Sequence, residues 1–133
     1  MKKLAEIFRA SQFYAHIAHN VASGSSFFSD HDYLGELYSA YESAYDDVVE
    51  RMIGLGQNPD LTEITMNAAK YIKGHTHDST EQCFAYLLSM EQEICDEISS
   101  LVKDASDGTQ NMLQDMADKS EMRQYKLGQR LKK

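Results

Sequence analysis

The sequence predicts an all-α protein, a bundle of four long helices with a short extra helix between the second and the third. Three observations lead to this prediction. The 133 residues include only one proline and seven glycines, so few residues interrupt regular structure. Apolar residues recur at three- and four-residue spacing over long stretches, which is the period of an amphipathic helix. Glycine, serine and proline gather in the short segments between those stretches.

The first long helix is expected over residues 3–22 and the second over residues 30–55. The apolar stripe of the first consists of Leu4, Ile7, Phe8, Tyr14, Ala15, Ala18 and Val21. Gly24 and two serines follow and end it, and either Ser29 or Asp30 is a suitable N-cap for the second helix. The stripe of the second consists of Leu34, Leu37, Tyr38, Tyr41, Tyr45, Val48, Val49 and Met52.

The remaining helices are separated by clear turn signals. A short helix is expected over residues 61–72, after two glycines and the proline. The third long helix is expected over residues 79–103. Asp107 and Gly108 predict a turn, after which the last helix runs over residues 109–131. No repeat, linker or low-complexity segment divides the chain, and we expect a single domain over residues 1–133.

The composition limits the classes of partner. The net charge is −8, which disfavours a nucleic acid or an anionic membrane as the main partner. No apolar run approaches the ~20 residues that a membrane span needs. Cys83 and Cys95 lie too far apart along one predicted helix to pair with each other. We expect two buried thiols in a reducing compartment, and therefore a cytoplasmic protein.

Four potential metal ligands lie at the two ends of one predicted helical hairpin. His19 is near the end of the first helix and His31 near the start of the second, so the hairpin brings them together. Asp46 and Glu50 are four residues apart and project from one helical face. Imidazoles with carboxylates suit iron. The second histidine and the aspartate are roughly 22 Å apart along their helix, so one chain cannot gather all four ligands. A two-fold dimer can.

Two further considerations bear on this site. Helix bundles that hold two irons in their core use Glu-x-x-His motifs, and this sequence contains none. Any metal site is therefore expected at an interface. The alternative is that Asp46, Asp47 and Glu50 form only a solvated acidic surface, which would be the natural interpretation without the two histidines.

The ligand spacing resembles the motif of the Dps mini-ferritins, the DNA-protection-during-starvation proteins of the ferritin-like superfamily. That motif reads histidine, eleven residues, histidine, three residues, aspartate, ten residues, aspartate, three residues, glutamate. The four candidate ligands match every position except the first aspartate, which falls on Gly35. Its neighbour Glu36 points about 100° away around the helix. Supporting similarities are found at Gly24, Phe27, Phe28, Tyr38, Arg51, residues 61–72 and residues 107–131.

The resemblance implies a ferritin-like bundle that assembles into a shell of twelve subunits, oxidises Fe(II), preferentially with hydrogen peroxide, and stores the ferric product. It implies iron bound by His19 and His31 of one subunit and by Asp46 and Glu50 of its partner. The loss at Gly35 implies one remaining metal position and a poor second one. The alternative is a bundle that kept the assembly, lost the iron chemistry, and serves as a structural or binding protein. DNA binding is unlikely on this resemblance, because only Lys2 and Lys3 stand for a long basic tail.

Several other polar residues have two interpretations each. His16 lies one turn before the first candidate ligand and is either a spare ligand or a histidine on the helix surface, and we favour the surface. The spacing of His75, His77 and Asp78 can bind a metal in a loop. We favour a polar start of the following helix, with Asp78 or Ser79 as its N-cap.

Basic and aromatic residues complete the set. The tyrosines at helical spacing are expected to be packing residues: Tyr38, Tyr41 and Tyr45. The last helix ends in a basic group, Arg123, Lys126, Arg130, Lys132 and Lys133. We expect these side chains to complement the helix dipole, and phosphate or DNA contact is the less favoured alternative.

Overall fold

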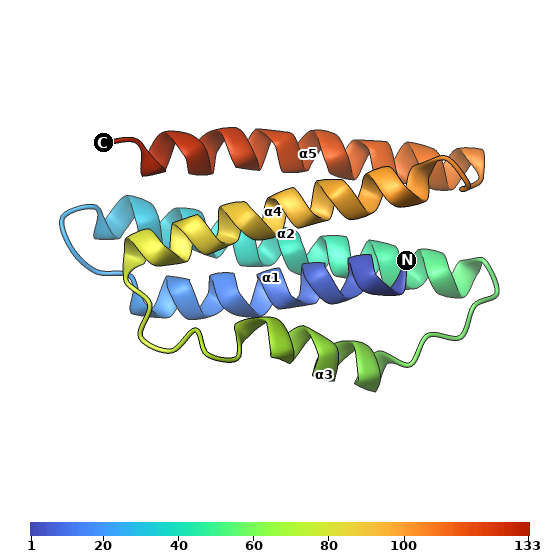
Figure 1. Ribbon diagram of the computed structural model, residues 1–133, viewed down its shortest axis with the longest axis horizontal. Coiled ribbons are helices and arrows are strands. Elements are labelled where there is room, and N and C mark those ends of the chain that lie inside the picture. The colour runs from blue at the N-terminus through green and yellow to red at the C-terminus, as the bar shows by residue number, and fades with distance from the viewer.

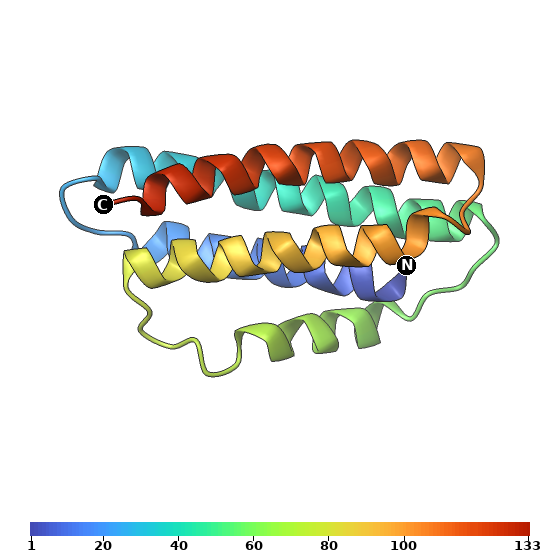
Figure 2. The ribbon, with the colours of Figure 1, turned by 45° about the horizontal axis from the view of Figure 1, so that its top comes forward.

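The computed structural model describes residues 1–133 and contains five α-helices (Figure 1). They are α1 (Lys2–Val21), α2 (Phe27–Gly54), α3 (Leu61–Ile72), α4 (Thr80–Val102) and α5 (Asp107–Leu131). The four long helices lie side by side, and α3 lies on the outside against α1 (Figures 1 and 2). The predicted all-α bundle, with its short helix between the second and third long helices, is confirmed.

The core lies between the long helices and reaches under α3. It consists of 27 buried apolar residues, and α3 adds Ile64 and Ala68 to it, both fully buried. Tyr41 and Tyr45 are buried there as well, as expected of packing residues. Val21 departs from its predicted stripe, because 53% of its surface is exposed at the last turn of α1. None of the helices has the length and apolar character needed to cross a membrane.

The predicted start of α2 is wrong by three residues. Ser26 is the N-cap and its side chain forms no capping bond, while Gly24 makes the preceding turn with a φ of +101°. Asp30 lies inside the helix and is 4% exposed. Its two carboxylate oxygens accept bonds of 2.9 Å from Nε and Nη2 of Arg130. A partner one hundred positions away leaves no local signal, so the local sequence indicates a cap at Ser29 or Asp30 instead.

Of the predicted starts of α4 and α5, one is confirmed and the other is wrong. Ser79 caps α4 in a capping box with Gln82, which confirms one of the two expected caps. The predicted turn at Asp107 and Gly108 is wrong, because both residues belong to the first turn of α5 and Ser106 is its N-cap. An aspartate in a first turn is favoured by the helix dipole, so these two residues also suit a helix start.

The segment before α4 is held against the bundle by Asp78. Its Oδ2 accepts hydrogen bonds from the hydroxyl of Tyr14 and from Nδ1 of His75. The ring of His75 stacks on Tyr86 with a centroid distance of 3.9 Å. No three His, Cys, Asp or Glu side chains converge into a metal site here or elsewhere in the chain. His75 and Asp78 thus form the expected polar start of α4.

Candidate metal site

A loop joins α1 and α2 at one end of the bundle (Figure 1). The two candidate histidines meet beside this loop. His19 lies in the last turn of α1 and His31 in the second turn of α2. Their rings stack with a centroid distance of 3.7 Å and an interplanar angle of 21°. The hairpin therefore brings them together as its connectivity predicted.

Each of these histidines is held by the backbone of the other. Nδ1 of His19 lies 2.7 Å from the carbonyl oxygen of His31, and Nδ1 of His31 lies 2.8 Å from the carbonyl oxygen of His19. A carbonyl oxygen only accepts, so each Nδ1 carries a hydrogen. In a neutral imidazole this leaves Nε2 with its lone pair. Histidines that bind metals are oriented by a bond of this kind from their other nitrogen.

The ring of His19 occupies the space above Gly35. A Cβ atom on Gly35 would lie 3.2 Å from Cε1 and 3.3 Å from Nδ1 of this ring. Such contacts are tight enough that a side chain here would force the ring to shift. Glu36, the neighbouring carboxylate, is exposed.

Aromatic rings surround the histidine pair. Tyr38 lies edge-on to His19 with a centroid distance of 5.4 Å, and His16 stacks on Tyr38 at 4.2 Å. On the other side His31 stacks on Phe27 at 4.9 Å. His16 is exposed, as expected of a surface histidine, and its ring centroid is 6.3 Å from that of His19. Tyr38 is a packing residue as expected, but it packs at the site.

The two candidate carboxylates lie on α2, away from the histidines. Asp46 and Glu50 are both exposed. The ion pairs of the chain involve other residues, so neither carboxylate is neutralised by a lysine or arginine of its own chain. The structure thus brings together the two histidines, and leaves the carboxylates separate and without partners.

Apolar side chains are exposed at both ends of this α1–α2 face. Near the histidines they are Ile17, Val21 and Phe28, with exposed fractions of 40%, 53% and 82%. Beyond the carboxylates they are Ile53 and Leu55, with 53% and 49%. One end of the face thus combines apolar residues with imidazoles and the other combines them with carboxylates.

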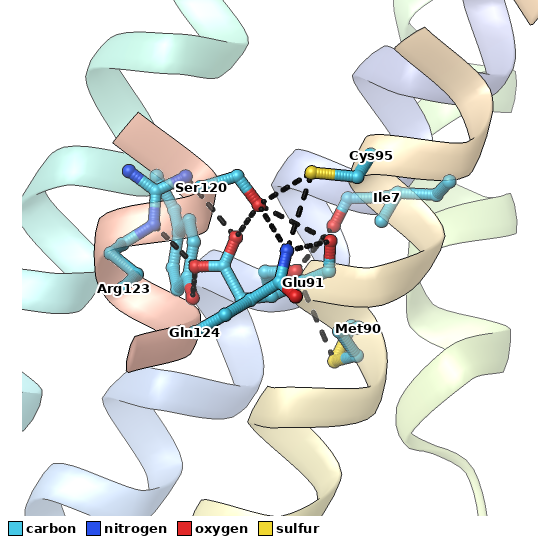
Figure 3. A network of polar contacts seen from close by, with 9 residues as sticks. Ile7, Met90, Glu91, Cys95, Ser120, Arg123 and Gln124 are labelled. Carbon is cyan, nitrogen blue, oxygen red and sulfur yellow. Dashed lines mark hydrogen bonds and ion pairs between the residues drawn. The ribbon is translucent and has the colours of Figure 1, made fainter. Parts of the chain in front are cut away.

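The interior of the bundle contains a second polar cluster that sequence reasoning missed (Figure 3). Glu91 of α4 is fully buried. Its carboxylate accepts hydrogen bonds from Nε and Nη2 of Arg123, from the hydroxyl of Tyr41 at 2.9 Å and from that of Ser120 at 3.0 Å. Burial and the neighbouring Glu91 charge raise the pKa of Tyr41 well above its ordinary value. A signal existed, because Glu91 lies in the apolar stripe between Leu87 and Ile94.

This cluster corrects the prediction of a basic patch at the end of α5. Arg123 points into the bundle, where its guanidinium also lies over the ring of Tyr41. Arg130 is paired with both Asp30 and Glu81. Two of the five predicted basic side chains are thus neutralised by carboxylates of the same chain.

The thiols lie elsewhere in the bundle. Cys83 and Cys95 are both free. The expectation of buried thiols is right for Cys83, and burial raises the pKa of its thiol. It is wrong for Cys95, which is only half-buried; its Sγ donates to Ser120 at 3.3 Å.

Comparison with known proteins identifies the architecture. The ferritin-like domain family matches residues 2–133. Dps from Listeria innocua in a zinc-soaked crystal is 23% identical, with a TM-score of 0.77 over 96% of this chain and 95% of that one. A double histidine-to-glycine mutant of the same protein and Dps from Listeria monocytogenes are each 22% identical, also with TM-scores of 0.77. They align with 96% of this chain and with 93% and 92% of their own.

Curated proteins give no significant match. The family match covers nearly the whole chain, whereas identities of 22–23% to the solved structures establish a common fold. The chain therefore belongs to the ferritin-like family, and its fold is that of the Dps mini-ferritins.

Proposed function

We propose that two copies of this chain pair through their α1–α2 faces and bind Fe(II) between them. His19 and His31 of one copy supply two imidazoles, and Asp46 and Glu50 of the other supply two carboxylates. The two-fold axis generates two equivalent sites. Iron is the substrate, and the ferric product is stored inside a closed oligomer of such pairs.

The observation that carries this proposal is the reciprocal bonding of the histidines. Because His19 and His31 each donate Nδ1–H to a carbonyl, both imidazoles are oriented before any metal arrives and keep Nε2 free. The same two bonds also join α1 to α2, and they leave one unused nitrogen on each ring for a ligand. Nearby, the exposed apolar residues Ile17, Val21 and Phe28 support an interface at the same place.

The similar structures support the choice of histidines. In the double mutant of Listeria innocua Dps, the two histidines replaced by glycine lie twelve positions apart in sequence. His19 and His31 are also separated by twelve. We therefore assign metal binding to His19 and His31, the pair whose spacing equals that of the two replaced histidines.

The donor set fits the chemistry of iron. Imidazole and carboxylate ligands bind Fe(II), and the anionic oxygens favour the more highly charged Fe(III). Hydrogen peroxide is the proposed oxidant: two Fe(II) ions lose one electron each, and these electrons with two protons reduce one peroxide to two waters. The side chains of the site bind the ions and hold them apart from bulk solvent at the interface.

The first test is an iron titration followed by ferric absorbance after addition of peroxide. The double variant His19→Ala/His31→Ala is expected to lose most of the oxidation rate seen with the wild-type protein. His77→Asn is the matched control, because His77 is exposed, is not one of the four proposed ligands, and has a φ of +64° that asparagine tolerates. Equal rates for the wild type and the double variant would contradict the proposal.

A second test asks whether the ligands come from different copies. The histidine double variant is co-expressed with Asp46→Asn/Glu50→Gln, each being inactive alone. Random pairing restores about a quarter of the wild-type sites, because half of the pairs are mixed and each mixed pair has one intact site. If the four ligands acted within one chain, mixing would restore nothing.

The alternative of a structural or binding protein is favoured by one observation, the absence of a side chain at Gly35. It predicts a stable oligomer that binds and oxidises no iron. Measuring the mass in solution together with the iron titration separates the two functions. A closed oligomer with iron oxidation supports storage, and the same oligomer without oxidation supports the alternative.

A further inference from the structure

We infer that glycine at position 35 shifts the relative affinity of the site away from Fe²⁺ and towards Zn²⁺, compared with a site that carries a carboxylate at this position. This inference rests on the proposed function, because it concerns the same four ligands. It assigns a role to a residue that has no side chain and binds nothing itself.

Without a side chain at position 35 the site has four donors. Two imidazoles and two carboxylates make a four-donor set, which is the number and type that tetrahedral Zn²⁺ accepts. A fifth ligand would have to be another carboxylate on the first turns of α2 or on the end of α1. Glu36 is exposed and points away. Oxygen donors favour the harder cations, so a site with one carboxylate fewer shifts its preference away from iron.

Position 35 faces the ring of His19. A Cβ on Gly35 would lie 3.2 Å from Cε1 and 3.3 Å from Nδ1 of His19. Position 35 therefore faces the Nδ1–Cε1 edge of this ring, and a longer side chain here would extend past that edge as the ring shifts. A carboxylate there would reach the same cation that the imidazole binds.

The space that a side chain at position 35 would occupy is filled by another residue. The ring of His19 fills it, stacking 3.7 Å from the ring of His31 while both Nδ1 atoms are bonded to carbonyls. The ring of His16 stacks on Tyr38, and its centroid lies 6.3 Å from that of His19. Gly35 thus produces a site that is rigid, rich in nitrogen and short of oxygen.

The test compares Zn²⁺ and Fe²⁺ affinities, measured by anaerobic calorimetry and by competition between the two ions, in the wild type and three variants. Gly35→Asp adds a carboxylate, Gly35→Asn has the same shape without the charge, and Gly35→Ala reproduces only the contact of Cβ with His19. Circular dichroism and solution mass check each fold and assembly. Because alanine and asparagine make the same Cβ contact, they separate steric displacement of the ring from metal ligation.

The wild type is expected to bind Zn²⁺ more tightly than Fe²⁺. Gly35→Asp is expected to narrow the ratio of the two affinities by about 10- to 100-fold, the range over which polar groups around a metal change its affinity. Gly35→Asn and Gly35→Ala should leave that ratio close to the wild-type value. An unchanged ratio in Gly35→Asp would overturn the inference.

These failures differ from a failure of the proposed function. If the wild type and His19→Ala/His31→Ala bind both metals equally, the site itself is absent and the proposed function fails. If metal binding depends on the histidines but the ratio of the Zn²⁺ and Fe²⁺ affinities is unchanged in Gly35→Asp, the proposed site is supported and only the role of Gly35 is refuted.

Discussion

The molecule contains two polar clusters that join helices, and they differ in what they leave unbonded. In the bundle interior both carboxylate oxygens of Glu91 are bonded to groups of the same chain, among them Arg123 and Tyr41. On the α1–α2 face, His19 and His31 use one ring nitrogen each and keep the other free. The interior cluster is complete in one chain, whereas the outer one is half complete.

The difference follows from what burial costs. A charge inside the bundle must be paired and hydrogen-bonded, because an unpaired one would cost several kcal/mol. A ring nitrogen near the surface needs no partner within the protein, because a water molecule can form a hydrogen bond to it until a ligand binds. Complete bonding therefore marks groups that stabilise the fold, and unused bonding capacity marks groups available for a ligand. The following predictions test this distinction, from the largest effect on stability to the smallest.

Breaking the interior pair should have the largest effect. Glu91→Gln leaves the charge of Arg123 buried without its counter-ion, and the free energy of unfolding should fall by about 3–5 kcal/mol. Denaturation in urea measures it, with the exposed Glu93→Gln as control. The double variant Glu91→Met/Arg123→Met should lose less than Glu91→Gln, because no unpaired charge remains. A loss below 1 kcal/mol in Glu91→Gln would refute a stabilising role.

The pair of Asp30 and Arg130 should come next. Asp30→Ala removes two charge-assisted hydrogen bonds that join the start of α2 to the end of α5. Hydrogen bonds to charged groups contribute about 1.5–3 kcal/mol, so a loss of this size is expected, with faster hydrogen exchange in the first turns of α2. The control is Asp32→Ala, which is exposed on the same turn. Equal losses in both variants would show that the contact with α5 contributes nothing.

The contribution of Asp78 should depend on pH. The hydrogen bond from Tyr14, and then that from His75, hold the pKa of this carboxyl below its ordinary value of 3.8. A carboxyl with a lowered pKa in the folded state stabilises the fold fully above pH 3.8, and this stabilisation is lost as the pH falls through the lower pKa. Asp78→Asn should therefore cost about 1–2 kcal/mol at pH 7.

Urea denaturation of Asp78→Asn and wild type between pH 7 and pH 3 checks this dependence. The difference between them should be constant above pH 3.8 and shrink below it. Asp115→Asn is the control, because its carboxylate is 58% exposed and pairs only with a surface lysine. A difference for Asp78 that grows as the pH falls would contradict the assignment.

The sequence predicts those features of the fold that are determined by residues close together in the chain. Apolar spacing and turn residues are local, and they predict the five helices, including α3 with both of its ends. The start of α2 could not be placed, because Asp30 bonds to a residue one hundred positions away. The order of ligands along the chain predicted that His19 and His31 meet. Their exchange of hydrogen bonds depends on ring orientation, which no spacing encodes.

Arg123 is a second residue whose position depends on a distant partner that the local sequence does not reveal. A basic residue near a helix end is usually solvated, so its charge alone predicts a surface position. Glu91, within an apolar stripe of α4, was the signal that a cation must turn inward. Combining the two requires knowing that α4 and α5 are neighbours, which the fold supplies and the local sequence does not.

The smallest effect on stability is expected for the two candidate carboxylates, whose replacement should abolish metal binding. Asp46→Asn/Glu50→Gln should change the free energy of unfolding of the metal-free protein by no more than about 0.5 kcal/mol, because exposed carboxylates without partners contribute little. The same variant should lose metal binding, measured by calorimetry with Zn²⁺ and Fe²⁺. Asp47→Asn is the matched control, since it removes the same charge from the next position of α2 and should retain binding. A large loss of stability in the double variant, or equal binding in both, would mean that these carboxylates serve the fold as Glu91 does. The distinction between complete and incomplete clusters would then fail at the residues where it is most specific.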